Sequence, residues 1–497
     1  MPVTRPEPAP RADRADEWHH QSPWMMVLRP IKQLPQLIPV AIAVFVAGSA
    51  APLMTLGATM LALVVLSVLP WLTTEYQVTD EHVRLRTGLL NRKVATARRD
   101  RIRSVDLTAP ALHRVLGLEK VVVGTGSDEG KVELDCVPAP YARALHDYLM
   151  PTGSPASTDP TTTVAVADPP QVLARFRTDW LRFAPFSLGG FAAAAAIVGF
   201  AVQFAMQANL LDRFERTGTA ALSRLADAPL GLVAGIAAAA VLVSGAVLSV
   251  GGYVLNYWGF TLARHPDATL RVSRGLLTTS ATSLDEVRVR GVHLHEPVLM
   301  RPLGGARLSA IATGSSKSPL LLPPAPRDEA AAVAGAVASG ADELSVPLVG
   351  HGRPARRRRF TRAALAGLVL AVVPLAAGVA GWIGPAASIA LAGVAVVAMT
   401  AVATVRYRHL GTRVTDRLLI IGPPRIARHR FLVERDGIVG WQLRATPFQR
   451  RQRVATLILA TAAGAEAYPM VDLADDAAAA VMVESTPEFV RPFLAAD

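Results

Sequence analysis

Cysteine and charged residues are both scarce in this chain of 497 residues. Cys136 is the single cysteine, so no intramolecular disulfide can form, and a secreted disulfide scaffold or a cysteine-based zinc site is excluded. Charged residues make up 18% of the chain and hydrophobic residues 51%, whereas soluble domains carry about 25% charged residues. The missing charge is concentrated in three regions of the chain, which predicts an integral membrane protein and excludes an ordinary soluble enzyme.

Long stretches without Asp, Glu, Lys or Arg predict the membrane spans. Residues 34–72 and 363–405 are charge-free and long enough for two helices each, because one span needs about 20 residues. In the region 183–260, two charge-free stretches flank a short charged loop. Gly381, Trp382 and Pro385 are typical turn and interface residues in the middle of the last stretch. We therefore predict six spans arranged as three hairpins.

The distribution of basic residues predicts the orientation of these hairpins. Arg29 and Lys32 precede the first hairpin, and the run Arg356–Arg359 precedes the third, while the predicted turns of both carry no charge. By the positive-inside rule, each hairpin enters the membrane from the cytoplasm and returns to it. The 33 mostly polar residues before the first span do not resemble a secretory signal. We expect a multi-pass protein of the cell membrane with both termini in the cytoplasm.

The three polar blocks that follow the hairpins are related to one another. A shift of 187 residues aligns the first block with the second without a gap, and a shift of 336 residues aligns it, more weakly, with the third. The first shift places Gly88–Leu90 on Gly275–Leu277 and Arg101 on Arg288. A unit made of a hairpin and a polar block is therefore used three times.

This repeat divides the chain into nine segments. They are a cytoplasmic N-terminal tail (1–33), hairpin 1 (34–72), block 1 (73–150), a linker (151–182), hairpin 2 (183–260), block 2 (261–340), a basic linker (341–362), hairpin 3 (363–405) and block 3 (406–493).

Each block has the pattern of short strands followed by one helix. In block 1, His82–Arg86 and Lys131–Val137 alternate between apolar and polar residues, as strands do. Pro140 precedes Tyr141–Leu149, whose apolar residues share one helical face. Block 2 ends in the same way, with a helix predicted over 328–338. This order is typical of a small β-barrel or sandwich that is capped by a helix.

Three motifs of block 1 resemble a known family. They are Val78–Asp80, Val83–Leu90 and Arg101–Val105. Together they are similar to the bacterial pleckstrin-homology-like (PH-like) domain of the YdbS/YdbT-like membrane-flanking proteins, which follows paired membrane spans. The resemblance covers all three units and is strongest in the first.

The resemblance implies a seven-stranded barrel with a capping helix in each block, and no catalytic residue, cofactor or metal, so we expect no enzymatic activity. The expected fold class is a membrane α + β protein, in which six transmembrane helices form three hairpins and a cytoplasmic PH-like β-barrel or sandwich with a C-terminal helix follows each.

Clustered arginines are the candidate binding residues of this basic chain, whose formal net charge is +12. A basic side chain near an anionic leaflet contributes about 1 kcal/mol, within roughly 10 Å of the surface. The same residues also fit topology signals or solvated strand faces, so both interpretations stay open. Scarce aromatic residues and the membrane location argue against nucleic acid as a partner. The candidates for contact with anionic lipid are Arg98, Arg99, Arg101, Arg103, Arg356, Arg357, Arg358 and Arg359.

Three other segments were weighed as sites. His293 and His295 share one face of a strand, but no third metal ligand is recognisable, which favours a surface strand. Gly124–Gly130 lacks the ending of a phosphate-binding loop and is predicted to be a hairpin turn. His19 and His20 lie in a polar tail and are interpreted as disordered. We therefore assign no metal or cofactor site.

These observations predict a scaffold or protein-interaction platform that presents three PH-like domains at the cytoplasmic face. The expected partners are the lipid bilayer and other membrane or cytoplasmic proteins, with further copies of the chain as an alternative. The resemblance alone suggests a setting in envelope stress or export. Two alternatives are an anionic-lipid sensor that uses the basic strands and an accessory component of a transport system. The absence of Asp, Glu, Lys and Arg within the spans argues against active transport.

Overall fold

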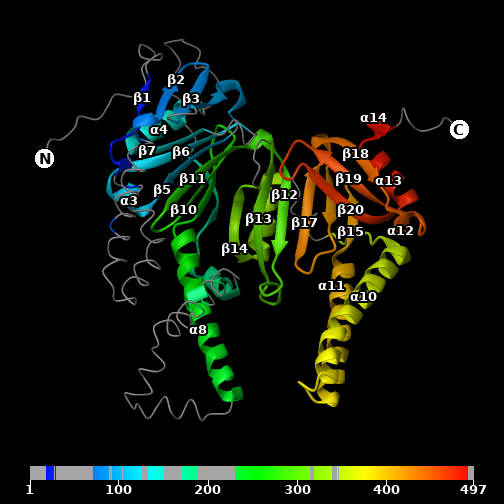
Figure 1. Ribbon diagram of the computed structural model, residues 1–497. Coiled ribbons are helices and arrows are strands. Elements are labelled where there is room, and N and C mark those ends of the chain that lie inside the picture. The colour runs from blue at the N-terminus through cyan, green and yellow to red at the C-terminus, as the bar shows by residue number, and fades with distance from the viewer. Residues whose placement is uncertain are drawn as a thin grey trace, which may run out of the picture. The chain divides into compact units, whose positions relative to one another are not determined.

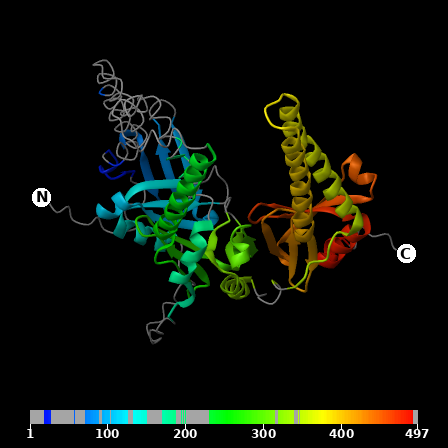
Figure 2. The same ribbon diagram turned by 90° about the horizontal axis from the view of Figure 1, so that it is seen from below.

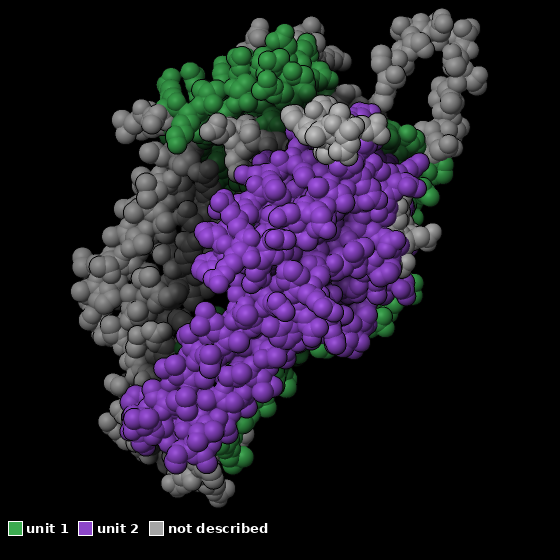
Figure 3. Space-filling model, turned by 90° about the vertical axis from the view of Figure 1, so that its right-hand side faces the viewer, with its two compact units in different colours: residues 1–285 green, residues 286–497 purple. Residues whose placement is uncertain are grey.

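A computed structural model of the chain describes residues 18–26, 28, 57, 71–88, 92–102, 104–125, 132–149, 169–186, 192, 194, 196, 197, 199, 230–313, 318–338, 344 and 346–490. The chain divides into two compact units, residues 1–285 and residues 286–497 (Figure 3). The boundary between the units falls inside block 2, directly after the third strand of that block.

Unit 1 contains two antiparallel sheets, with the orders β1-β2-β3-β4 and β7-β6-β5-β11-β10-β9-β8 (Figure 1). The strands are β1 (His19–His20), β2 (Glu75–Val78), β3 (His82–Thr87), β4 (Lys93–Arg98), β5 (Ser104–Ala109), β6 (Leu118–Gly124), β7 (Val132–Pro138), β8 (Gln171–Arg175), β9 (Thr261–Arg264), β10 (Thr269–Arg274) and β11 (Thr279–Asp285). The helices are η2 (Arg99–Arg101), α3 (Ala111–Val115), α4 (Ala139–Leu149), η4 (Thr178–Phe186) and α8 (Leu230–Tyr257).

Unit 2 also contains two antiparallel sheets, with the orders β14-β13-β12-β17-β16-β15 and β18-β19-β20. The strands are β12 (Val289–Glu296), β13 (Gly305–Ala312), β14 (Leu320–Pro326), β15 (Gly411–Val414), β16 (Leu418–Gly422), β17 (Arg428–Glu434), β18 (Ile438–Arg444), β19 (Val454–Thr461) and β20 (Ala467–Ala474). The helices are η5 (Glu286–Arg288), η6 (Arg301–Leu303), α9 (Arg327–Ala338), α10 (Gly352–Val379), α11 (Pro385–His409), η8 (Arg435–Gly437), α12 (Pro447–Arg450), α13 (Asp475–Ser485) and α14 (Pro487–Val490).

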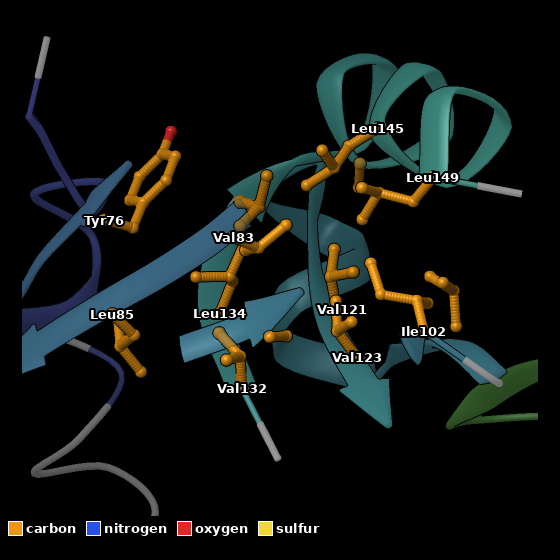
Figure 4. Close-up of a cluster of buried hydrophobic side chains, with 14 of the residues drawn as sticks. Tyr76, Val83, Leu85, Ile102, Val121, Val123, Val132, Leu134, Leu145 and Leu149 are labelled. Carbon is orange, nitrogen blue, oxygen red and sulfur yellow. The ribbon is translucent and has the colours of Figure 1, made fainter. Parts of the chain in front are cut away.

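The alternating sequence pattern accounts for the core of block 1. β3 buries Val83 and Leu85 and directs its arginines to the other face. Leu145 and Leu149 point from α4 toward the buried side chains of the strands (Figure 4). Burying one such leucine contributes about 1.5–3 kcal/mol. The predicted strands at 82–86 and 131–137 and the predicted helices at 141–149 and 328–338 are confirmed as β3, β7, α4 and α9.

Each long sheet combines strands of two consecutive repeats. β5, the fourth strand of block 1, pairs with β11, the third strand of block 2, so that Ser104 lies opposite Leu284. β12 and β17 repeat this pairing between blocks 2 and 3, with Gly291 opposite Val433. The register is the same, because the shifts that align the blocks carry Ser104 onto Gly291 and Leu284 onto Val433. The expected β-rich domains are present, but the expectation of one β-barrel or sandwich for each block did not include that consecutive repeats share their sheets.

A short strand or an isolated bridge also precedes each predicted hairpin and pairs with the first strand that follows it. β1 pairs with β2, β8 pairs with β9, and Val349 forms an isolated bridge to Thr412 of β15. The interpretation of His19 and His20 as disordered is wrong, because they form β1. Residues 171–175, inside the predicted linker, form β8. Only with these strands do the first two repeats reach the seven strands that the family resemblance implies.

Three described helices are long and apolar enough to cross a membrane, namely Ala238–Tyr257 within α8, together with α10 and α11. α10 and α11 lie side by side as the predicted third hairpin (Figures 1 and 2). Gly381 adopts a φ of +77° in the turn, and Pro385 begins α11. The other three predicted spans lie almost wholly outside the described residues.

Gly291→Ala should weaken the shared sheet of unit 2. A Cβ at Gly291, whose φ is +147°, would lie 2.0 Å from the carbonyl oxygen of Leu432 on β17. At Gly440, the equivalent residue of block 3, a Cβ meets no described atom within 4 Å. We expect Gly291→Ala to lower the free energy of unfolding by about 1–3 kcal/mol or more, and Gly440→Ala to change it by less than about 0.5 kcal/mol. Pulse proteolysis in urea measures both, and equal effects would contradict the shared sheet.

Candidate functional site

Two of the predicted lipid-contact arginines have partners inside block 1, at the corner between β4 and β5. The Arg98 Nη2 lies 3.2 Å from a carboxylate oxygen of Asp100. Arg99 packs over the Tyr148 ring, with its Cζ 4.3 Å from the ring centroid, and donates a 3.0 Å hydrogen bond to the Tyr148 carbonyl oxygen. The contacts of Arg99 hold its side chain against the protein, whereas the Arg98 side chain remains 55% exposed beside Asp100.

Three other candidates keep exposed side chains: Arg101 of η2, and Arg356 and Arg357 in the first turns of α10. Arg356 also lies over the ring of Phe360, with its Cζ 5.7 Å from the centroid. Arg103 lies outside the described residues. The lipid-sensor alternative therefore depends mainly on these three exposed arginines and on Arg98.

Arg358 and Arg359 are buried at the base of the third hairpin, with exposed fractions of 4% and 6%. The Arg358 Nε lies 2.8 Å from Oδ1 of Asp472, and the Arg359 Nη2 lies 3.0 Å from Oδ2 of the same carboxylate. Asp472 is fully buried and also accepts a 2.9 Å hydrogen bond from the Gln449 amide. For these two arginines, an internal ion-pair cluster replaces the predicted contact with lipid.

Local backbone structure directs these groups toward one another. Asp472 has a φ of +59° and lies in β20, which changes register against β19. Gln449 is the third residue of α12 and closes a capping box with Thr446. No motif in the sequence predicts this site. Two features of the sequence nevertheless point to it. Asp472 is the single acidic residue in the otherwise mostly apolar strand β20, and the run of arginines that begins α10 has no acidic residue nearby in the sequence to neutralise it.

His351 connects the beginning of α10 to the same block. Its Nδ1 lies 2.8 Å from the Val471 carbonyl oxygen, and its Nε2 lies 2.9 Å from the Thr412 hydroxyl. Burial lowers the pKa of His351, which favours the neutral ring. We call Asp472, Arg358, Arg359, Gln449 and His351 the hairpin anchor, because they join the first turns of α10, a helix long and apolar enough to cross a membrane, to the sheet of block 3.

Block 1 has a related buried group at the equivalent positions. The 336-residue shift aligns Cys136 with Asp472 and His113 with Gln449, and Cys136 also has a positive φ, of 58°. The His113 Nε2 lies 3.1 Å from Oδ1 of Asp135 and 3.6 Å from the Cys136 Sγ.

Within the described residues, His113, Asp135 and Cys136 are the one group with the composition and spacing to hold a metal ion, a juxtaposition that sequence spacing did not indicate. Asp135 and Cys136 both lie next to Nε2 of His113. In a catalytic triad, one ring nitrogen of the histidine contacts the nucleophile and the other contacts the carboxylate. The geometry therefore does not match a catalytic triad.

The histidines of β12 form a row with the neighbouring strand β17. The His293 Nε2 lies 3.0 Å from the His429 Nδ1, and the rings of His295 and His429 stack with centroids 4.3 Å apart. Burial and the neighbouring histidines lower the pKa of His293 to about 3, and burial with nearby positive charge lowers that of His429 to about 3. Stacked neutral rings pack the sheet, and their parallel planes do not converge on one metal position.

Comparison with known proteins agrees with the repeat. A family model described as the bacterial PH domain matches residues 31–152, 207–341 and 364–490. These matches cover most of the chain, and the three-repeat resemblance drawn from the sequence is confirmed. No curated protein and no solved structure matches the chain.

Asp472→Asn should destabilise the protein strongly, because it leaves two buried guanidinium groups without a counter-charge. Breaking a buried ion pair by removing one partner costs about 3–5 kcal/mol. Asp475→Asn, at an exposed position three residues later, is the matched control and should change the free energy of unfolding by less than about 0.5 kcal/mol. Urea unfolding of the full chain in detergent measures both. Equal tolerance of the two substitutions would show that the hairpin anchor contributes nothing.

The stability of unit 2 should fall as the pH decreases below about 6.5, the ordinary pKa of histidine in an unfolded chain. Between that value and about 3, the unfolded chain binds more protons than the folded one. The stabilising contribution is therefore complete above about pH 6.5 and is lost progressively on acidification. His429→Phe removes one titrating ring from the row, so its thermal unfolding temperature should depend less on pH. If the unfolding temperature of His429→Phe depended on pH as steeply as that of the unchanged protein, the histidine row would not be the source of the pH dependence.

Proposed function

Because the chain belongs to the bacterial PH-domain family, we propose that it is a non-catalytic membrane scaffold, which presents three β-rich repeats at the cytoplasmic face for contacts with other proteins. Envelope stress or export is the setting that the family resemblance implies. The proposal includes six membrane spans in three hairpins.

The pairing of strands on either side of each hairpin is the observation that carries this proposal. The chain leaves a sheet after β1, β8 or Val349. When it returns, it forms β2, β9 or β15, and each of these strands pairs with the strand or residue at which the chain left. Paired antiparallel strands lie about 4.8 Å apart, so both ends of each intervening apolar segment are on the same side of the membrane. A segment with both ends on one side crosses the membrane an even number of times, which favours hairpins in all three repeats.

The charges at the third hairpin support a cytoplasmic location for the blocks. Arg356 and Arg357 are exposed in the first turns of α10, and Arg406 and Arg408 lie in the last turn of α11. The turn around Trp382, at the opposite end of the hairpin, carries no charge. Basic residues remain preferentially on the cytoplasmic side.

The hairpin anchor gives block 3 a fixed mounting on the membrane, since His351, Arg358 and Arg359 hold the beginning of α10 against β15 and β20. A flexible tether would suit recruitment of the block to the membrane, whereas a fixed mounting suits a platform of defined orientation. Catalysis by the Cys136–His113 pair of block 1 would need a site that a substrate can reach. Both side chains are buried, with exposed fractions of 1% and 0%.

Topology labelling tests the proposal. In a Cys136→Ser background, single cysteines replace Val115 of block 1, Phe448 of block 3 and Trp382 of the hairpin turn, which are 84%, 76% and 83% exposed. A membrane-impermeant maleimide should label Trp382→Cys in right-side-out vesicles, and Val115→Cys and Phe448→Cys only in inverted vesicles. Labelling of Val115→Cys and Phe448→Cys from opposite sides would contradict the even number of crossings between them.

Photo-crosslinking amino acids at the same three positions provide the second readout. The scaffold proposal expects defined protein adducts from positions 115 and 448 in cells, with position 382 as the matched control on the other face. Adducts from position 382 alone would contradict a cytoplasmic platform.

A further inference from the structure

Two strands of the kind that form the junctions, β4 and β18, lie at the edges of their sheets in the part of the chain that the structure describes. The third strand of each block pairs with the fourth strand of the block before it, in β11 with β5 and in β17 with β12. β4 is the third strand of block 1 and β18 is the fourth strand of block 3, so they correspond to the two partners of each junction. Within the described residues, no strand pairs with the outer edge of β4 or of β18.

Side chains on these two edges are exposed where their internal counterparts are buried. Leu443 on β18 is 55% exposed, whereas Leu107 and Leu294, at the same position of the first two repeats, are 6% and 2% exposed. Val94 on β4 is 53% exposed, whereas Arg430, its counterpart on β17, is 4% exposed. The difference marks two surfaces that the repeat normally covers with a neighbouring strand, and exposed apolar edges invite such pairing.

We propose that copies of this chain associate head to tail, with β18 of one copy pairing antiparallel with β4 of the next. The occupant is a second copy because the chain itself forms this contact twice, in one register. Extending that register opposes Gly440 to Ala97, Trp441 to Thr96, Gln442 to Ala95, Leu443 to Val94, and Arg444 to Lys93. The contact is heterologous, since two different edges meet, so it propagates into a filament or closes into a ring.

Charge sets the conditions under which these edges pair. The proposed register places Arg444 of one copy opposite Lys93 of the next, and directly opposed like charges are destabilising in a sheet. The internal junctions have Thr108 with Ser280 and His295 with His429 at this position. Association between copies should therefore strengthen as salt screens the repulsion. Lys93→Glu reverses the sign of this contact and should increase association about 1.4- to 5-fold.

Mixed disulfide cross-linking of the full chain in membranes tests the proposal. Two Cys136→Ser chains with different affinity tags are co-expressed, one carrying Val94→Cys and the other Leu443→Cys. Oxidation should produce a species of double mass that carries both tags, because opposed residues bring their Cβ atoms within disulfide reach.

Val439→Cys replaces Leu443→Cys in the matched control. Val439 is exposed on the same strand, but lies roughly 13 Å from the opposed position. We expect at least about 10-fold less cross-linking in this pair, and Lys93→Glu should raise the yield of the in-register pair.

Equal yields from Leu443→Cys and Val439→Cys would overturn the register, and absence of the mixed species would overturn the association. A chain that carries both Val94→Cys and Leu443→Cys and closes a disulfide within itself would show that the edges pair intramolecularly, which also overturns it.

Head-to-tail association rests on the proposed function, because it requires both strand edges on one face of the membrane. Different results would refute the membrane scaffold and the head-to-tail association. Opposite labelling of Val115→Cys and Phe448→Cys refutes both, whereas labelling on one face without the mixed species refutes head-to-tail association alone.

Discussion

Backbone pairing between the fourth strand of one repeat and the third strand of the next organises the β-rich part of this chain. Each of the two long sheets contains such a junction, and the register is the same in both, so the contact is a property of the repeat and not of one pair of sequences. At Gly291 the strands approach so closely that a side chain has no room. An arrangement of independent β-barrels joined by linkers would need no such approach.

The predicted hairpins are connected to the shared sheets at both of their ends. Because a strand or bridge before each apolar segment pairs with the strand that follows it, the sheet holds both ends of the segment together. In block 3, the hairpin anchor adds a buried carboxylate that faces two buried guanidinium groups. Desolvation offsets much of the attraction in such clusters, so their role is better understood as fixing orientation than as adding stability.

Local patterns were sufficient for the strands β3 and β7, the helices α4 and α9 and the third hairpin. β3, β7, α4 and α9 follow from periodicity within ten or so residues, and the turn at Gly381 follows from its residue types. β1 and β8 could not be predicted in this way. A strand of two residues has no period, and β8 gains its place only from pairing with β9, which lies far away in the sequence.

The sequence by itself determined the threefold repeat, the apolar stretches and the alternating strands and closing helix of block 1, because those features depend on residue types and spacings that can be read along the chain. The assignment of individual arginines required the fold. Arg356 and Arg359 lie three residues apart and have the same side-chain chemistry. Arg356 is exposed, whereas Arg359 pairs with the carboxylate of Asp472, 113 residues further along the chain. Burial and pairing over such a separation are set by how β20 returns to the beginning of α10, and no local pattern encodes that path.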